Sequence, residues 1–104
     1  MLEHVDVVDP FEELTEEQLR EVIEHCIEWG RTVIGGHGGQ DRMAERHITG
    51  GQILAALRGR LRTESRVAGK WRYCGSKNGI HVIFTFDTDD EGNLLVIVTL
   101  IRED

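Results

Sequence analysis

The hydrophobic residues of the chain follow two periods, and the change from one to the other falls near residue 60. Before that point apolar positions recur every three or four residues, at Leu19, Val22, Ile23, Cys26, Ile27, Ile53, Leu54, Leu57 and Leu61. This spacing is typical of amphipathic helices. After Gly59 the period becomes two, and Ile80, Val82, Phe84 and Phe86 alternate with other residues, as in half-buried strands. The pattern predicts an α+β fold in which N-terminal helices pack on a C-terminal antiparallel sheet.

The same local signal predicts the start of each of the two longer helices. Thr15 and Gln18 match a capping box, in which each of the two side chains bonds to the other residue's backbone N–H. Thr49 and Gln52 repeat this arrangement. The first helix is expected to run on through Val33 until the glycines at 35 and 36 end it. A short helix over about 40–46, with an entry loosened by glycines, should connect the two.

The C-terminal part predicts a meander of about four strands. They are expected over residues 62–67, 70–74, 80–86 and 94–101. Ala68-Gly69 indicates a tight turn, and Asn78-Gly79 is a strong signal for a type I′ hairpin. The last strand is apolar on both faces and is therefore expected inside the sheet. A chain of 104 residues has room for one domain: an N-terminal extension (1–14), a helical half (15–60) and a sheet half (61–104).

The charged residues are segregated along the chain. Its formal net charge is −7, but residues 1–28 contain ten acids and one base, whereas residues 42–78 contain nine bases and two acids. A basic middle of this kind favours an anionic partner more than the net charge suggests. No secretion signal is expected, since no apolar stretch follows a basic segment near residue 1, and no apolar run of the sequence is long enough to span a bilayer. We therefore expect a cytoplasmic protein with no membrane partner, in which Cys26 and Cys74 are free thiols and Cys26 is a core residue.

The central segment carries a motif that points to a family. Arg42-Met43, Arg46, Ile48-Thr49 and the run Val96-Ile97-Val98-Thr99 stand in order after His37. In this the chain resembles a family of small, largely uncharacterised bacterial domains related in fold to RelE- and MqsR-type mRNA-cleaving toxins, whose architecture is similar to that of barnase. The resemblance implies metal-independent RNA cleavage, or RNA binding in a degenerate relative. It also implies a neutralising, antitoxin-like protein partner.

Metal-free RNA cleavage requires a base for the 2′-hydroxyl proton, cations for the phosphate and an acid for the leaving oxygen. His37 and His47 are candidate proton carriers, because imidazole titrates near neutral pH. The candidate catalytic set is His37, Arg42, Arg46, Tyr73 and Thr99. The candidate nucleic-acid-binding set is Arg62, Arg66, Lys70 and Arg72.

These residues also have ordinary structural interpretations, which the sequence leaves open. Arg42 and Arg46 are four apart and suit a solvated helix face, and Thr99 suits a strand interior. Tyr73 and Trp71 could stack on unpaired bases or pack in the core. Strand alternation puts them on the opposite face from Lys70 and Arg72, so phosphate binding and stacking are not expected on the same face.

A second function remains open beside the nuclease. Four carboxylates form a stripe on one face of the first helix, namely Glu17, Glu21, Glu24 and Glu28. Such a stripe could imitate a nucleic-acid backbone in a non-enzymatic inhibitor protein. No metal or cofactor is expected, since the acidic segment 87–98 lacks the final bidentate ligand of a calcium loop. The histidines and cysteines also lack zinc-ligand spacing.

Overall fold

The computed structural model describes residues 12–103; most of the predicted N-terminal extension therefore lies outside the described residues. Helix α2 (Glu16–Glu28) begins at the predicted capping box. The Thr15 side-chain oxygen accepts the Gln18 N–H at 3.2 Å, and the Gln18 side-chain oxygen accepts the Thr15 N–H at 2.9 Å. The sequence therefore predicted the start of this helix correctly.

The end of α2 differs from the prediction. Gly30 adopts φ +66°, and the N–H groups of Gly30 and Arg31 bond to the carbonyls of Ile27 and Cys26. These two bonds make a Schellman motif, which closes the helix. The expectation that the helix continues through Val33 is wrong, because the β-branched residues after Gly30 form strand β1 (Thr32–Ile34) instead.

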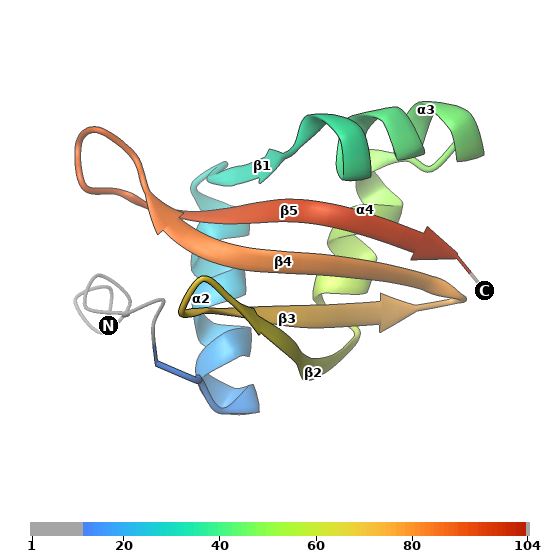
Figure 1. Ribbon diagram of the computed structural model, residues 1–104. Helices are drawn as coiled ribbons and strands as arrows, with labels where there is room; N and C mark the ends of the chain where they lie inside the picture. The colour runs from blue at the N-terminus through green and yellow to red at the C-terminus, as the bar shows by residue number, and fades with distance from the viewer. Residues whose placement is uncertain (1–11, 104) are drawn as a thin grey trace.

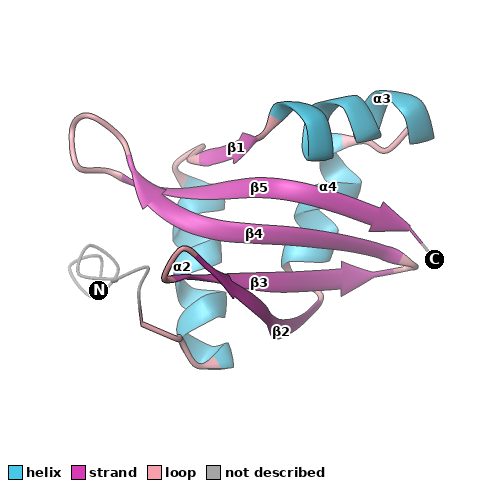
Figure 2. Cartoon of the chain, viewed as in Figure 1, coloured by secondary structure: helices cyan, strands magenta, loops and turns pink. Residues whose placement is uncertain are grey.

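The sheet has five strands, one more than expected, and it is mixed rather than purely antiparallel. Its order is β1-β5-β4-β3-β2 (Figures 1 and 2). The four strands besides β1 are β2 (Arg60–Val67), β3 (Lys70–Lys77), β4 (Ile80–Thr88) and β5 (Leu94–Glu103). Strand β1 pairs in parallel with β5, so β5 is an interior strand, as its apolar sequence predicted. The other neighbours are antiparallel.

Both predicted hairpin turns are present. Ala68 and Gly69 have φ values of 52° and 83°, and Asn78 and Gly79 have 53° and 81°. Two successive positive φ values are the signature of type I′ turns, whose twist suits adjoining strands. The turns fix the register of β2, β3 and β4, and so decide which side chains share a face.

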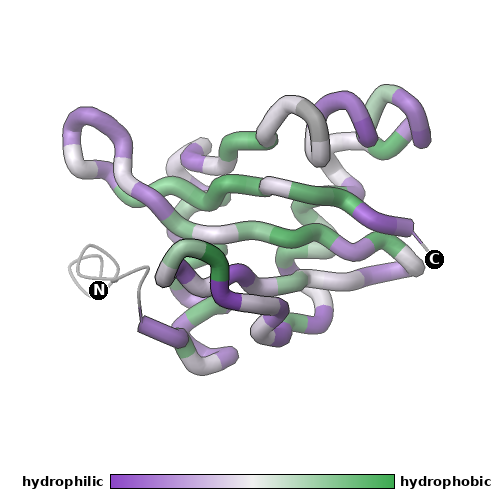
Figure 3. The backbone as a smooth tube through the Cα atoms, in the orientation of Figure 1, coloured by the Kyte–Doolittle hydropathy of each residue, from purple (hydrophilic) through white to green (hydrophobic). Residues whose placement is uncertain are grey.

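One face of the sheet is covered by α2 and by helix α4 (Gly50–Leu57), which contacts β3 and β4. The hydrophobic spacing predicted Leu61 as part of this helix. Leu61 instead lies in β2, and its side chain is buried there. The core between the layers includes Tyr73, Phe84 and Phe86, whose ring centroids lie 5.7–5.9 Å apart. Figure 3 shows the hydrophobic stretches of the chain following β4 and β5. A Cβ on Gly75 would lie 2.5 Å from the Ala56 carbonyl oxygen, so glycine there allows α4 to pack closely.

A short π-helical turn, η1 (Gly36–Gln40), and helix α3 (Asp41–Arg46) follow β1. Both contact β5, and in Figure 1 they lie along the β1 edge of the sheet. The short helix predicted over 40–46 is thus present. Its position brings two arginines near the C-terminal end of β5.

Candidate functional site

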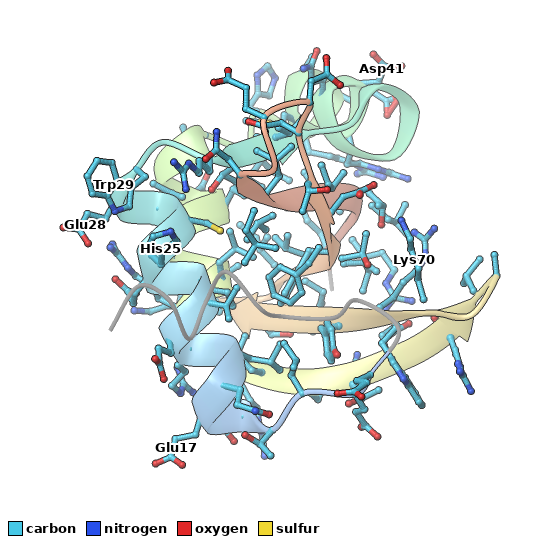
Figure 4. The ribbon with its side chains drawn as sticks, turned by 90° about the vertical axis from the view of Figure 1, so that its left-hand side faces the viewer. Glu17, His25, Glu28, Trp29, Asp41 and Lys70 are labelled. Atoms are coloured by element: carbon cyan, nitrogen blue, oxygen red, sulfur yellow. The ribbon has the colours of Figure 1, made fainter. Side chains whose placement is uncertain are left out.

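The second face of the sheet is not covered by any helix of the described residues (Figure 1). Cross-strand pairs define its residues: Cys74 lies opposite Ile83, and His81 lies opposite Arg102. By the same register this face carries Arg62, Lys70, Arg72, Ser76, Thr85, Leu95, Ile97 and Leu100. We call it the open face. In Figure 4, Lys70 points away from the side on which α2 lies.

Two surface hollows adjoin at one end of the open face. The first, about 450 Å³, is lined by Arg42, Arg46, Arg102 and Glu103. The second, about 320 Å³, is lined by Arg62, His81, Arg102 and Glu103. Because Arg102 and Glu103 line both, the hollows lie next to each other, and we treat them as one candidate site. We refer to its four guanidinium groups, those of Arg42, Arg46, Arg62 and Arg102, as the arginine cluster.

Tight packing of η1 against β5 places α3 at this site. A Cβ on Gly38 would overlap the Thr99 carbonyl oxygen and would lie 3.1 Å from Leu100 Cα. A Cβ on Gly39 would lie 2.7 Å from Ile34 Cγ2. The sequence suggested that these glycines loosen the entry to the short helix, and that interpretation is wrong. Only residues without a side chain let the η1 backbone approach β5 and bring Arg42 and Arg46 beside Arg102.

The cluster contains an ion-pair network. The Glu64 carboxylate accepts a hydrogen bond from Arg62 at 2.6 Å and one from Arg102 at 3.0 Å. These contacts, above all the Arg62 hydrogen bond, lower the pKa of Glu64. Arg46 lies 3.9 Å from Glu103, while Arg42 has no ion pair with any residue that the structure describes. The cluster therefore retains excess positive charge.

His81 joins the cluster from β4, and sequence reasoning did not select it. Its Nδ1 lies 2.7 Å from Ser76 Oγ, and Ser76 Oγ lies 3.5 Å from Cys74 Sγ. This contact orients the imidazole at the edge of the second hollow. A signal was present in the sequence, since strand alternation turns His81 away from the core residues Ile80 and Val82. Its neighbour Arg102, however, can be identified only from the register.

The structure brings three of the predicted residues together, namely Arg42, Arg46 and Arg62. Lys70 and Arg72 share the open face with them, and Lys70 pairs with Asp87 at 3.3 Å. Arg66 lies on the opposite face of the β2–β3 ribbon, where its guanidinium is 5.3 Å from the Trp71 ring centroid. It is therefore separated from the other predicted nucleic-acid-binding residues.

Tyr73 belongs to the core face and is 1% exposed. Its hydroxyl accepts the Leu14 N–H at 3.0 Å and donates to the Glu12 carbonyl at 3.4 Å, so it anchors the segment before α2. Because the sheet separates Tyr73 from the arginine cluster, Tyr73 does not share a bound group with those arginines.

The Thr99 hydroxyl donates a hydrogen bond to the Ile83 carbonyl at 3.2 Å, across an irregularity in the β4–β5 pairing.

Of the two histidines predicted as proton carriers, His47 is not among the residues that line the two hollows, and the position of the His37 side chain is not described. His37 belongs to η1, but its side chain lies outside the described residues. His47 is exposed at the C-terminal cap of α3 with φ 56°. This left-handed conformation ends the helix, which gives His47 a structural role independent of any chemistry.

One of the four carboxylates of the acidic stripe on α2 is held in an ion pair. Figure 4 shows Glu17 and Glu28 on the side of α2 away from the sheet. Between them, Glu24 binds Arg58 through both oxygens, at 2.7 and 3.0 Å. Arg58 therefore neutralises one position of the row that a nucleic-acid mimic would present.

Within residues 12–103 there is no group of three or more histidine, cysteine or acidic side chains that could hold a metal ion. No helix in that same range is long and apolar enough to cross a membrane. Comparison of the chain with models of known protein families, with curated proteins and with solved structures found no match.

Proposed function

We propose that the chain is an RNA-binding domain that cleaves RNA without a metal ion, with the arginine cluster as its phosphate site. The observation that carries the proposal is the convergence of four arginines and His81 on two adjoining hollows. They come from α3, β2, β4 and β5, so folding gathers them from distant parts of the sequence. Guanidinium groups bind phosphate oxygens in a forked geometry that suits such a site.

The chemistry assigns separate roles to the cations and the imidazole. Attack of the 2′-oxygen on phosphorus builds negative charge on the phosphate, which the arginines stabilise. His81 takes the proton from the 2′-hydroxyl, and the departing 5′-oxygen receives a proton from solvent water. The bond from phosphorus to the 2′-oxygen forms as the bond to the 5′-oxygen breaks, leaving a 2′,3′-cyclic phosphate.

The open face favours binding through the RNA backbone. Within the described part of the chain its apolar residues are aliphatic, such as Ile97 and Leu100, whereas Tyr73, Phe84 and Phe86 face the core. Stacking on aromatic rings is a common way to bind unpaired bases. With no described Phe, Tyr or Trp ring on this face, contacts to phosphate dominate, and we expect weak preference for base identity.

We extend the proposal to the fold and the cellular partners. Helices on one face of a largely antiparallel sheet support a RelE- or barnase-like architecture, although the parallel β1 is an addition to the expected meander. Such a nuclease would act in the cytoplasm and would need a neutralising, antitoxin-like partner. The open face also carries aliphatic side chains, namely Leu95, Ile97, Leu100 and, beside Ile97, Val33. Val33 is 43% exposed and Leu100 36%, which supports a protein contact beside the arginine cluster.

The test is incubation of mixed-sequence RNA with the purified protein in excess EDTA. We expect cleavage with 2′,3′-cyclic phosphate ends, strongly reduced in His81→Ala and in Arg42→Gln/Arg46→Gln. The matched control is Arg58→Gln, which removes a guanidinium from the opposite layer and should leave cleavage unchanged. Intact RNA with the folded wild-type protein would refute the nuclease activity, and equal loss in the control would refute the site.

A further inference from the structure

Glu64 stands between two arginines of the cluster. One of its carboxylate oxygens accepts from Arg62 on the same strand, and the other accepts from Arg102 on β5. Strands β2 and β5 are not neighbours, because β3 and β4 lie between them. The side chains therefore reach across the open face to meet. On β3 and β4, between the two strands, lie Cys74 and Ile83. Their side chains are only 0% and 4% exposed, although no described helix covers this face.

A β-bulge aims Glu64 at this position. The pairing of β2 with β3 shifts between Thr63, opposite Tyr73, and Ser65, opposite Arg72. Glu64 is the additional residue at this shift. Bulges redirect a side chain at the cost of regular pairing, and they are common beside functional sites.

The arrangement around Glu64 matches what a phosphate group requires. Two guanidinium groups from different strands each hold one oxygen of a single anion, beside a hollow of about 320 Å³ that both arginines line. A phosphodiester also presents two charged, non-bridging oxygens, and arginine binds carboxylate and phosphate with the same forked geometry. The place that Glu64 fills is therefore suited to a phosphate.

We propose that Glu64 is a built-in competitor at the phosphate site, and that a phosphate ester binds Arg62 and Arg102 by displacing it. This inference rests on the proposed function for its ligand, RNA, but the displacement applies to any phosphate group. The Glu64 side chain is 22% exposed, and those of Arg62 and Arg102 are about half exposed. Ion pairs at this exposure contribute little to stability, so replacing the Glu64 carboxylate by another anion costs little free energy. Since contact with Arg62 and Arg102 also lowers the pKa of Glu64, its carboxylate is ionised at neutral pH.

The decisive variant is Glu64→Gln, which keeps the shape of the side chain and removes its charge. Binding is measured with a labelled RNA oligonucleotide that is fully 2′-O-methylated and cannot be cleaved. We expect the variant to bind about threefold to tenfold more tightly than the wild type, the range expected when two competing surface ion pairs, those of Glu64 with Arg62 and Arg102, are removed. The added substitution Arg62→Gln should remove that gain.

The matched control is Glu24→Gln. It removes the same charge from a carboxylate bound by an arginine, Arg58, on the helical layer. At physiological salt its long-range effect on RNA binding is largely screened, so we expect a change of less than about twofold. Equal gains in the two variants, or weaker binding by Glu64→Gln, would overturn the inference.

Inorganic pyrophosphate as a second probe separates this inference from the proposed function. If Glu64→Gln binds pyrophosphate more tightly than the wild type while neither binds RNA, the displacement stands and the proposed RNA substrate is wrong. If both proteins bind RNA and pyrophosphate equally well, RNA binding stands and the displacement is wrong. Unfolding curves show that each variant is folded before binding is compared.

Discussion

The two faces of the sheet are built from the same strands but differ in composition. In β4, Val82, Phe84 and Phe86 face the helices and are at most 1% exposed, while His81 and Thr85 face the other way. The centre of the core face is apolar and includes Tyr73, Phe84 and Phe86. The open face combines aliphatic side chains with cations held in salt bridges. The difference fits the proposal that one face serves stability and the other binds an anion.

The largest expected difference between the faces is in the cost of truncation. Phe84 is fully buried between Tyr73 and Phe86, and Phe84→Ala should lower the free energy of unfolding by about 3–5 kcal/mol. Leu100, on the open face, is 36% exposed, and Leu100→Ala should cost less than about 1 kcal/mol. Urea denaturation measures both. Similar costs would contradict the assignment of the two faces.

Substitution of Gly38 tests how α3 brings two arginines, Arg42 and Arg46, to the arginine cluster. In Gly38→Ala the new Cβ meets the β5 backbone at Thr99, so η1 must shift, at a cost of about 1–3 kcal/mol. The shift should also weaken RNA binding, because α3 carries Arg42 and Arg46. Gly36→Ala is the control, since nothing lies within 4 Å of a Cβ there. Equal effects of the two substitutions on unfolding and RNA binding would refute this account.

The core between the sheet and α2, which includes Cys26, should also respond to alkaline pH. Burial raises the pKa of the Cys26 thiol from 9.0 to about 11, so the folded state favours the neutral form. The resulting stability is fully present below pH 9 and is lost as the pH rises toward 11. Between pH 8 and 10 the loss is about 1.4 kcal/mol. The free energy of unfolding of Cys26→Ala, measured over this range, should not show this loss. The same pH dependence in the wild type and the variant would contradict the prediction.

The smallest expected change in stability is on the open face. Lys70 forms an exposed pair with Asp87, and Lys70→Ala should change the free energy of unfolding by less than about 1 kcal/mol. Its effect should appear in RNA binding instead. Loss of one phosphate contact lowers the slope of log affinity against log salt by about 0.7 for single strands. An unchanged slope would restrict the RNA site to the arginine cluster.

The sequence predicted the parts of the fold that depend on local signals. The capping boxes at Thr15 and Thr49 and the turn at Asn78-Gly79 involve residues close together in the chain, and each occurs where it was expected. Strand β1 was missed because its apolar residues continue the pattern of α2. Only Gly30 marks the break, and the pairing partner, β5, lies more than sixty residues away.

The candidate site was predicted only in part, for a similar reason. Arg42, Arg46 and Arg62 stand out in the basic middle of the sequence, where charge segregation points to them. Arg102 lies in an acidic segment, and His81 in a strand without other charges before Asp87. Their convergence depends on the β4–β5 register, which includes an irregularity between Ile83 and Phe84. That register cannot be predicted from composition or from the spacing of residues in the sequence.

The most direct test of the central claim is the salt dependence of RNA binding by two double variants of equal charge. Arg62→Gln/Arg102→Gln removes two guanidiniums from the arginine cluster, and Arg20→Gln/Arg58→Gln removes two from the helical layer. We expect the first to bind the uncleavable RNA much more weakly, with a salt slope reduced by about 1.4 for two lost phosphate contacts. The second should bind as the wild type does. Equal losses in both would show that overall charge, rather than the arginine cluster, governs binding, and would contradict the account.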